Sequence, residues 1–143
     1  MNALGSPTPV WFRIAGIVAV LWELIGVWSY LGHVRAVPPM QPMTPAQEAL
    51  AATVPGWVTG AFAVAVFVGL LASFAMLFGR AQARLLFLLS LVCILVQSVW
   101  VLFVSNARAV EGNVALVMPL VITGIGLLFY WLSSTGVKRG WLR

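Results

Sequence analysis

Four long apolar stretches divide the chain, and polar segments separate them. A helix rises ~1.5 Å per residue, so about 20 mostly apolar residues cross the hydrocarbon core of a bilayer. The pattern predicts spans over about residues 10–31, 56–79, 85–104 and 113–136. We therefore predict an all-α four-helix transmembrane bundle, formed by a single membrane domain over residues 1–143.

The first loop, residues 32–55, is the longest polar interruption of this pattern and is rich in proline. Within it, Thr44-Pro45-Ala46-Gln47 has the arrangement of a capping box, with Thr44 as N-cap and Pro45 at the first helical position. This motif predicts a short helix over about residues 45–53, which is too short to span and is expected to lie at the periplasmic membrane surface. The residues expected to face inward are Ala46, Ala49, Leu50 and Val54.

The composition agrees with a membrane protein, because 62% of the residues are hydrophobic and only 8% are charged. Soluble domains carry about 25% charged residues, so a soluble domain is excluded. The net charge of +5 is explained by topology rather than by nucleic-acid binding. The expected partners are the lipid bilayer and, by self-association or otherwise, further membrane subunits.

The cations indicate the orientation of the chain. Four spans place both termini on one side, and that side then carries six of the eight basic residues, against Arg35 and Arg108 on the other. Cytoplasmic loops are enriched in Lys and Arg, so both termini are predicted to be cytoplasmic, in a bacterial inner membrane. Aromatic residues expected at the two interfaces are Trp11, Trp131 and Trp141 inside, and Trp28, Tyr30, Trp57 and Trp100 outside.

Polar side chains at similar depth form the candidate intramembrane site. Glu23 and Gln97 lie at matching positions in the first and third spans, and Thr123 is the residue near that depth in the fourth. The first and third spans are diagonal partners in an up-down bundle, so Glu23 and Gln97 are placed to meet across the core. Small residues near Glu23 would let a neighbouring helix approach closely; they are Gly16, Ala19 and Gly26.

Two interpretations of Glu23 stay open. An acid at this depth costs about 2.5–3.5 kcal/mol on insertion scales, which is typical of a functional proton or cation site. Alternatively, Glu23 is a neutral carboxyl bonded to Gln97 or to a backbone carbonyl, where each contact contributes ~0.6 kcal/mol to helix packing. Pro119 is expected to kink the fourth span, which either helps to form a substrate site or is an ordinary feature of a membrane helix.

The sequence contains no residue pattern that is typical of an enzyme active site. The chain has one histidine, His33, and one cysteine, Cys93, and no nucleophile–base pair or phosphate-binding loop is evident. We therefore expect no enzyme activity, no catalytic residue, no metal site and no cofactor.

The whole chain resembles a family of small four-span bacterial membrane proteins that are often labelled "sugar transporter" or hypothetical. The motifs that carry the resemblance are Leu21-Trp22-Glu23-Leu24-Ile25-Gly26, Pro55-Gly56-Trp57, Ala61-Phe62-Ala63-Val64-Ala65-Val66, Val96-Gln97, Met118-Pro119 and Gly140-Trp141-Leu142-Arg143. Members of this family usually carry Asn at the position of Glu23, so the shared feature is a polar, hydrogen-bonding group. The resemblance implies transport but names no mechanism.

Two functions follow as hypotheses. The first is a non-enzymatic structural or accessory component of the membrane. The alternative is a small oligomeric transporter or channel, proton-coupled in one version, that uses Glu23, Gln97 and the Pro119 region. A dry, fully packed core would favour the first hypothesis, and a water-accessible cavity reaching Glu23 would favour the second.

Overall fold

The computed structural model describes residues 7–143, so residues 1–6 of the expected domain lie outside the described residues. Its long helices are α1 (Val10–His33), α3 (Gly56–Leu77), α4 (Ala83–Val99) and α6 (Val114–Lys138). Its short segments are α2 (Pro45–Ala52), the π-helical turn η1 (Trp100–Val104), which continues α4, and α5 (Ala107–Glu111). Within residues 7–143, four helices, with α4 and η1 counted together, are long and apolar enough to cross a membrane. The predicted all-α four-helix bundle is confirmed, and the chain is a small integral membrane protein.

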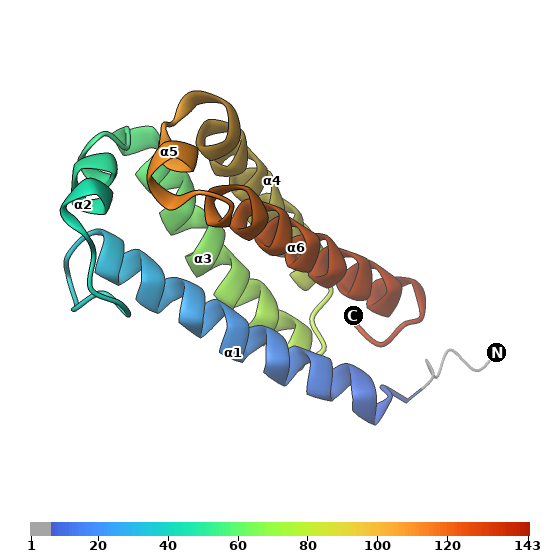
Figure 1. Cartoon of the computed structure of the whole chain (residues 1–143). Helices are drawn as coiled ribbons and strands as arrows, with labels where there is room; N and C mark the ends of the chain where they lie inside the picture. The colour runs from blue at the N-terminus through green and yellow to red at the C-terminus, as the bar shows by residue number, and fades with distance from the viewer. Residues whose placement is uncertain (1–6) are drawn as a thin grey trace.

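The long helices lie side by side in one bundle, and each packs mainly on the helix that precedes or follows it in the chain (Figure 1). α1 packs on α3, α3 on α4 and α4 on α6, whereas α1 and α6 share no comparable seam. Figure 1 places the start of α1 and the end of α6 at one end of the molecule and α2 and α5 at the other. We call the first the basic end, because it carries Arg13, Arg80, Arg84, Lys138, Arg139 and Arg143, and the second the α2 end.

Small residues of α1 bring it close to α3, as their spacing indicated. A methyl group added at Gly16 would lie 3.4 Å from the Cα atom of Leu77, and one added at Gly26 would lie 3.1 Å from Cγ1 of Val66. The faces of the helices that point away from these seams expose large apolar side chains such as Leu71. These faces contact lipid, because lipid tails solvate them as well as a protein core would.

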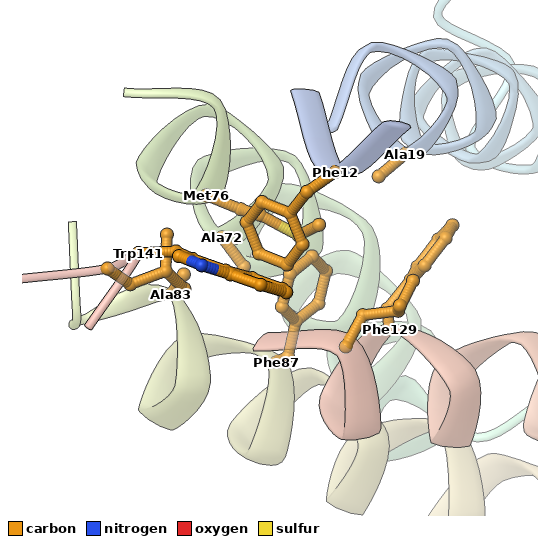
Figure 2. Packing of buried hydrophobic residues seen from close by; sticks show 10 residues of the cluster. Phe12, Ala19, Ala72, Met76, Ala83, Phe87, Phe129 and Trp141 are labelled. Carbon is orange, nitrogen blue, oxygen red and sulfur yellow. The ribbon is translucent and has the colours of Figure 1, made fainter. Parts of the chain in front are cut away.

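The main hydrophobic core lies at the basic end, where aromatic side chains from three helices and the C-terminal tail meet (Figure 2). The rings of Phe12 and Trp141 lie 5.2 Å apart between centroids, and those of Phe87 and Phe129 lie 5.5 Å apart. Figure 2 shows Phe12 of α1 and Trp141 of the tail lying against each other. This cluster closes the basic end of the bundle.

Backbone hydrogen bonds hold the C-terminal tail in this place. The N–H of Arg143 donates to the carbonyl of Gly79 (2.8 Å), and the N–H of Ala81 donates to the carbonyl of Arg143 (3.0 Å). The tail therefore pairs with the α3–α4 loop, and this pairing carries Trp141 into the core.

Two of the tryptophans expected at the membrane interfaces are buried within the protein. Trp100 and Trp141 are each only 8% exposed, whereas Trp11, Trp28, Trp57 and Trp131 are about half exposed, as interfacial residues should be. Trp141 is buried by the returning tail, and Trp100 begins the π-helical turn η1. Position along a span predicts the depth of a side chain, but packing decides whether that side chain faces lipid or protein.

The predicted capping box of α2 is confirmed, but of the expected inward face only Leu50 and Val54 turn toward the bundle. The Thr44 hydroxyl accepts from the N–H of Gln47 (3.3 Å), and the Gln47 amide oxygen accepts from the N–H of Thr44 (2.9 Å). Ala46 and Ala49 are exposed. The face turned toward the bundle comprises Gln47, Leu50, Ala51 and Val54. An eight-residue helix with alanine on several sides has no dominant apolar stripe, so its neighbours select the buried face.

The loop predicted at residues 105–112 contains the short helix α5. The Ser105 hydroxyl accepts from the N–H of Ala107 (3.3 Å), and Gly112 ends the helix with a φ of 62°. Such a conformation suits glycine, which has no Cβ. α5 contacts α2, so both short helices cover the α2 end.

Candidate intramembrane binding site

A cavity of about 140 Å³ lies in the bundle beside Glu23. All four long helices contribute to its wall, and Gln97 of α4 lines it together with Glu23 of α1. We call it the inner cavity. Its other lining residues are mostly apolar or aromatic, among them Trp22, Phe62 and Ile122. The structure therefore brings the two predicted polar residues to one cavity.

The Glu23 side chain is held in a narrow place between α1 and α3. The residue is only 7% exposed. A methyl group added at Gly69 would lie 2.6 Å from the carboxyl carbon of Glu23, so only glycine leaves room for the carboxyl group at this position. Because Gly69 has no side chain, the acid can fold against the α3 backbone and still line the inner cavity.

The carboxyl group of Glu23 has no hydrogen-bond partner among the residues that the structure describes. Among residues 7–143, neither Gln97 nor any backbone group bonds to either oxygen of Glu23. Buried polar side chains are normally bonded, so an unbonded acid facing a cavity requires an explanation. The expected Glu23–Gln97 bond is replaced by open space between the helices.

Gln97 and Phe62 line the inner cavity and also two further cavities toward the α2 end. One, of about 230 Å³, also has Glu111 and Pro119 in its wall. The second, of about 200 Å³, also has His33 in its wall. Beneath α2 lies another of about 220 Å³, which shares His33 with the second and Glu111 with the first. We call these three cavities the outer crevice.

Thr123 is not part of this site. Its hydroxyl lies 3.4 Å from the hydroxyl of Ser98, so the two form a hydrogen bond between α6 and α4. It does not line the inner cavity or the outer crevice. Equal depth on different helices does not make residues neighbours, because each helix also has a rotation about its own axis.

Pro119 lines the outer crevice, and α6 continues through it without interruption. Proline has no N–H, so the carbonyl of Ala115 lacks its usual helical donor. Ala115 lies in the same wall. The kink expected at Pro119 stays a prediction.

Three features of the site were not foreseen from the sequence. Gly69 is one glycine among several in the second span, and only the position of Glu23 shows its role. Glu111 was assigned to a loop, and it reaches the crevice because α5 folds over the α2 end. The π-helical turn η1 has no sequence signature, yet it places Trp100 and Val101 in the crevice wall. Such turns are frequent at functional sites.

Among residues 7–143, no group of three or more His, Cys, Asp and Glu side chains is placed to hold a metal ion. In comparisons with known proteins, no family model, curated protein or solved structure matches the chain.

Proposed function

We propose that the protein is a small, non-enzymatic transporter of the bacterial inner membrane that binds a small molecule in the inner cavity. The observation that carries this proposal is the cavity at Glu23. Unfilled space beside a buried acid lowers the stability of the bundle, so a purely structural component has no need for it. A carrier requires such space to hold its ligand.

The two ends of the bundle differ in a way that supports one-sided access. The cavities of the outer crevice lie between the inner cavity and the α2 end, whereas the aromatic core around Phe12 and Trp141 lies at the basic end. At that end, a separate cavity of about 500 Å³ has Arg13 and Met76 in its wall. The basic end is proposed to be cytoplasmic, because it gathers six of the eight Lys and Arg residues. On this proposal, a ligand enters from the periplasm and release to the cytoplasm requires the aromatic core to open.

The chemistry of the inner cavity suits binding. Ligand sites are mostly apolar with a few convergent polar groups, and here Glu23 and Gln97 are those groups. The cavity volume of about 140 Å³ is below the ~300–1,000 Å³ that drug-sized ligands occupy, so the ligand is expected to be small.

Cysteine accessibility tests the proposal. In a Cys93→Ala background, Gln97→Cys places a thiol at the junction of the cavities, and Leu95→Cys places one on the lipid-facing side of the same helix. A small, membrane-impermeant methanethiosulfonate added to the periplasmic side should label Gln97→Cys and leave Leu95→Cys unlabelled, because only a hydrated thiol ionises and reacts.

Two further variants check the route. Ile122→Trp should fill the inner cavity and reduce labelling of Gln97→Cys, whereas Val121→Trp, on the exposed face of α6, should not. If Gln97→Cys is unlabelled from either side, the core is dry and the structural hypothesis stands. Labelling from the cytoplasmic side alone would reverse the proposed orientation.

A further inference from the structure

The charges of the chain are distributed unevenly around the site. The protein has eight Lys and Arg residues and only three acids, Glu23, Glu48 and Glu111. Glu23 lines the inner cavity and Glu111 lines the outer crevice. Among residues 7–143, no Lys or Arg lines either space. In a protein of net charge +5, the cavities between the α2 end and Glu23 are therefore lined by two of the three acids and, within residues 7–143, by no Lys or Arg.

The Glu23 carboxyl lacks the partner that a buried acid normally has. Its surroundings are apolar and its oxygens have no hydrogen-bond donor among residues 7–143, although open space adjoins it. A buried carboxyl group is normally hydrogen-bonded or paired with a cation, so a ligand in the cavity is expected to supply the missing partner.

The other residues that line the inner cavity indicate which kind of cation it would bind. Side-chain oxygens reach the inner cavity only from Glu23, Ser29 and Gln97 among the described residues. A Ca²⁺ ion needs about six to eight oxygen ligands, so this set is too small for a hard metal ion. Aromatic side chains are well represented, with Trp22 and Phe62 at the inner cavity and Trp100 in the crevice. Aromatic faces attract organic cations, and the apolar wall accommodates a hydrocarbon body.

From these observations we infer that the inner cavity binds a small organic cation, an ammonium group on an apolar body, with the ammonium paired to Glu23. This inference rests on the proposed function and names the ligand class of the same site. Glu111 attracts the cation toward the crevice, and Gln97 offers an amide oxygen on the way to Glu23.

Three ligands of similar shape and different charge test the inference: phenethylammonium, phenethyl alcohol and phenylacetate. Their binding to the full chain in phosphatidylcholine nanodiscs would be measured by calorimetry, with empty nanodiscs subtracted. Wild type should bind phenethylammonium at least about tenfold more tightly than the alcohol, because hydrogen bonds to charged groups are the stronger ones, and should bind phenylacetate weakest.

The variants assign the preference to Glu23. Glu23→Gln should bind the cation and the alcohol equally, whereas Glu48→Gln, which removes the acid exposed on α2, should keep the wild-type preference. The comparison of the three ligands on wild type decides the charge preference even if Glu23→Gln does not fold.

The outcomes separate this inference from the proposed function. Equal binding of cation and alcohol to wild type, with both lost in Ile122→Trp, would overturn the ligand class and leave the carrier proposal intact. Failure of all three ligands to bind, with Gln97→Cys still labelled, would likewise overturn only the ligand class. Unlabelled Gln97→Cys would overturn the carrier proposal and, with it, this inference.

Discussion

The carboxyl group of Glu23 lies against Gly69 of the neighbouring helix, so closely that a methyl group on Gly69 would stand 2.6 Å from the carboxyl carbon. The Glu23 carboxyl group of α1 thus occupies the space that a side chain at Gly69 of α3 would fill. The position of the acid depends on the glycine, because the three atoms nearest to a methyl group on Gly69 all belong to the Glu23 carboxyl group.

Gly69→Ala should therefore displace the Glu23 carboxyl. The acid is the end of a flexible side chain, so the variant should lose only about 1 kcal/mol of unfolding free energy relative to a matched glycine substitution. Gly60→Ala on the same helix is that control, because an added methyl group meets nothing within 4 Å. Unfolding in mixed micelles would measure both. Equal stability, together with unchanged preference for phenethylammonium, would show that Gly69 does not position the acid.

Trp141 should tolerate loss of its indole N–H but not of its ring. Among residues 7–143 its Nε1 atom has no hydrogen-bond partner, although it is buried. Trp141→Phe should cost less than about 1.5 kcal/mol, because it keeps the aromatic contact with Phe12 and loses no hydrogen bond. Trp141→Ala should cost about 3–5 kcal/mol, because it leaves a hole in the core.

The same micelle assay would measure both Trp141 variants. The Ala variant would also open the basic end, so Gln97→Cys in that background should become reactive toward reagent on the cytoplasmic side. A Trp141→Phe variant as unstable as Trp141→Ala would contradict the packing described here.

Affinity for a permanently charged cation should rise with pH. A proton and a cation compete for the carboxyl of Glu23, so binding of benzyltrimethylammonium should weaken toward low pH, by at most about tenfold per pH unit. Calorimetry between about pH 5 and pH 9 would measure it. The other titratable groups of the crevice are His33 and Glu111. The dependence should disappear in Glu23→Gln and persist in His33→Asn; the reverse result would assign it to His33.

Reporter fusions would test the orientation. Alkaline phosphatase is active only outside the cytoplasm, so a fusion after Val110, at the α2 end, should be active and one after Gly79, at the basic end, inactive. The two positions lie at opposite ends of the bundle. The opposite activities would place the crevice at the cytoplasmic side and require the direction of entry to be reversed.

Much of the fold could be predicted because membrane insertion depends on local chemistry. Residues 10–31 were predicted as the first span and α1 comprises Val10–His33, since an apolar run of that length has one stable state in lipid. The cap of α2 was equally local, because Thr44 and Gln47 are within one turn of each other. Glu23 and Gln97 were predicted to meet from their equal depth and the diagonal arrangement of their spans, and both line the inner cavity without bonding to each other.

The sequence by itself determined the number of long apolar helices and their lengths, because each depends on a single helix and its solvent. Only the tertiary structure decided that Glu23 lies on Gly69, that Thr123 pairs with Ser98 and that Trp141 closes the basic end. These contacts depend on the rotation of each helix about its axis and on the path of the tail. In lipid, apolar side chains are satisfied in either direction, so hydrophobicity does not set these rotations; they are decided by the fit between neighbouring helices.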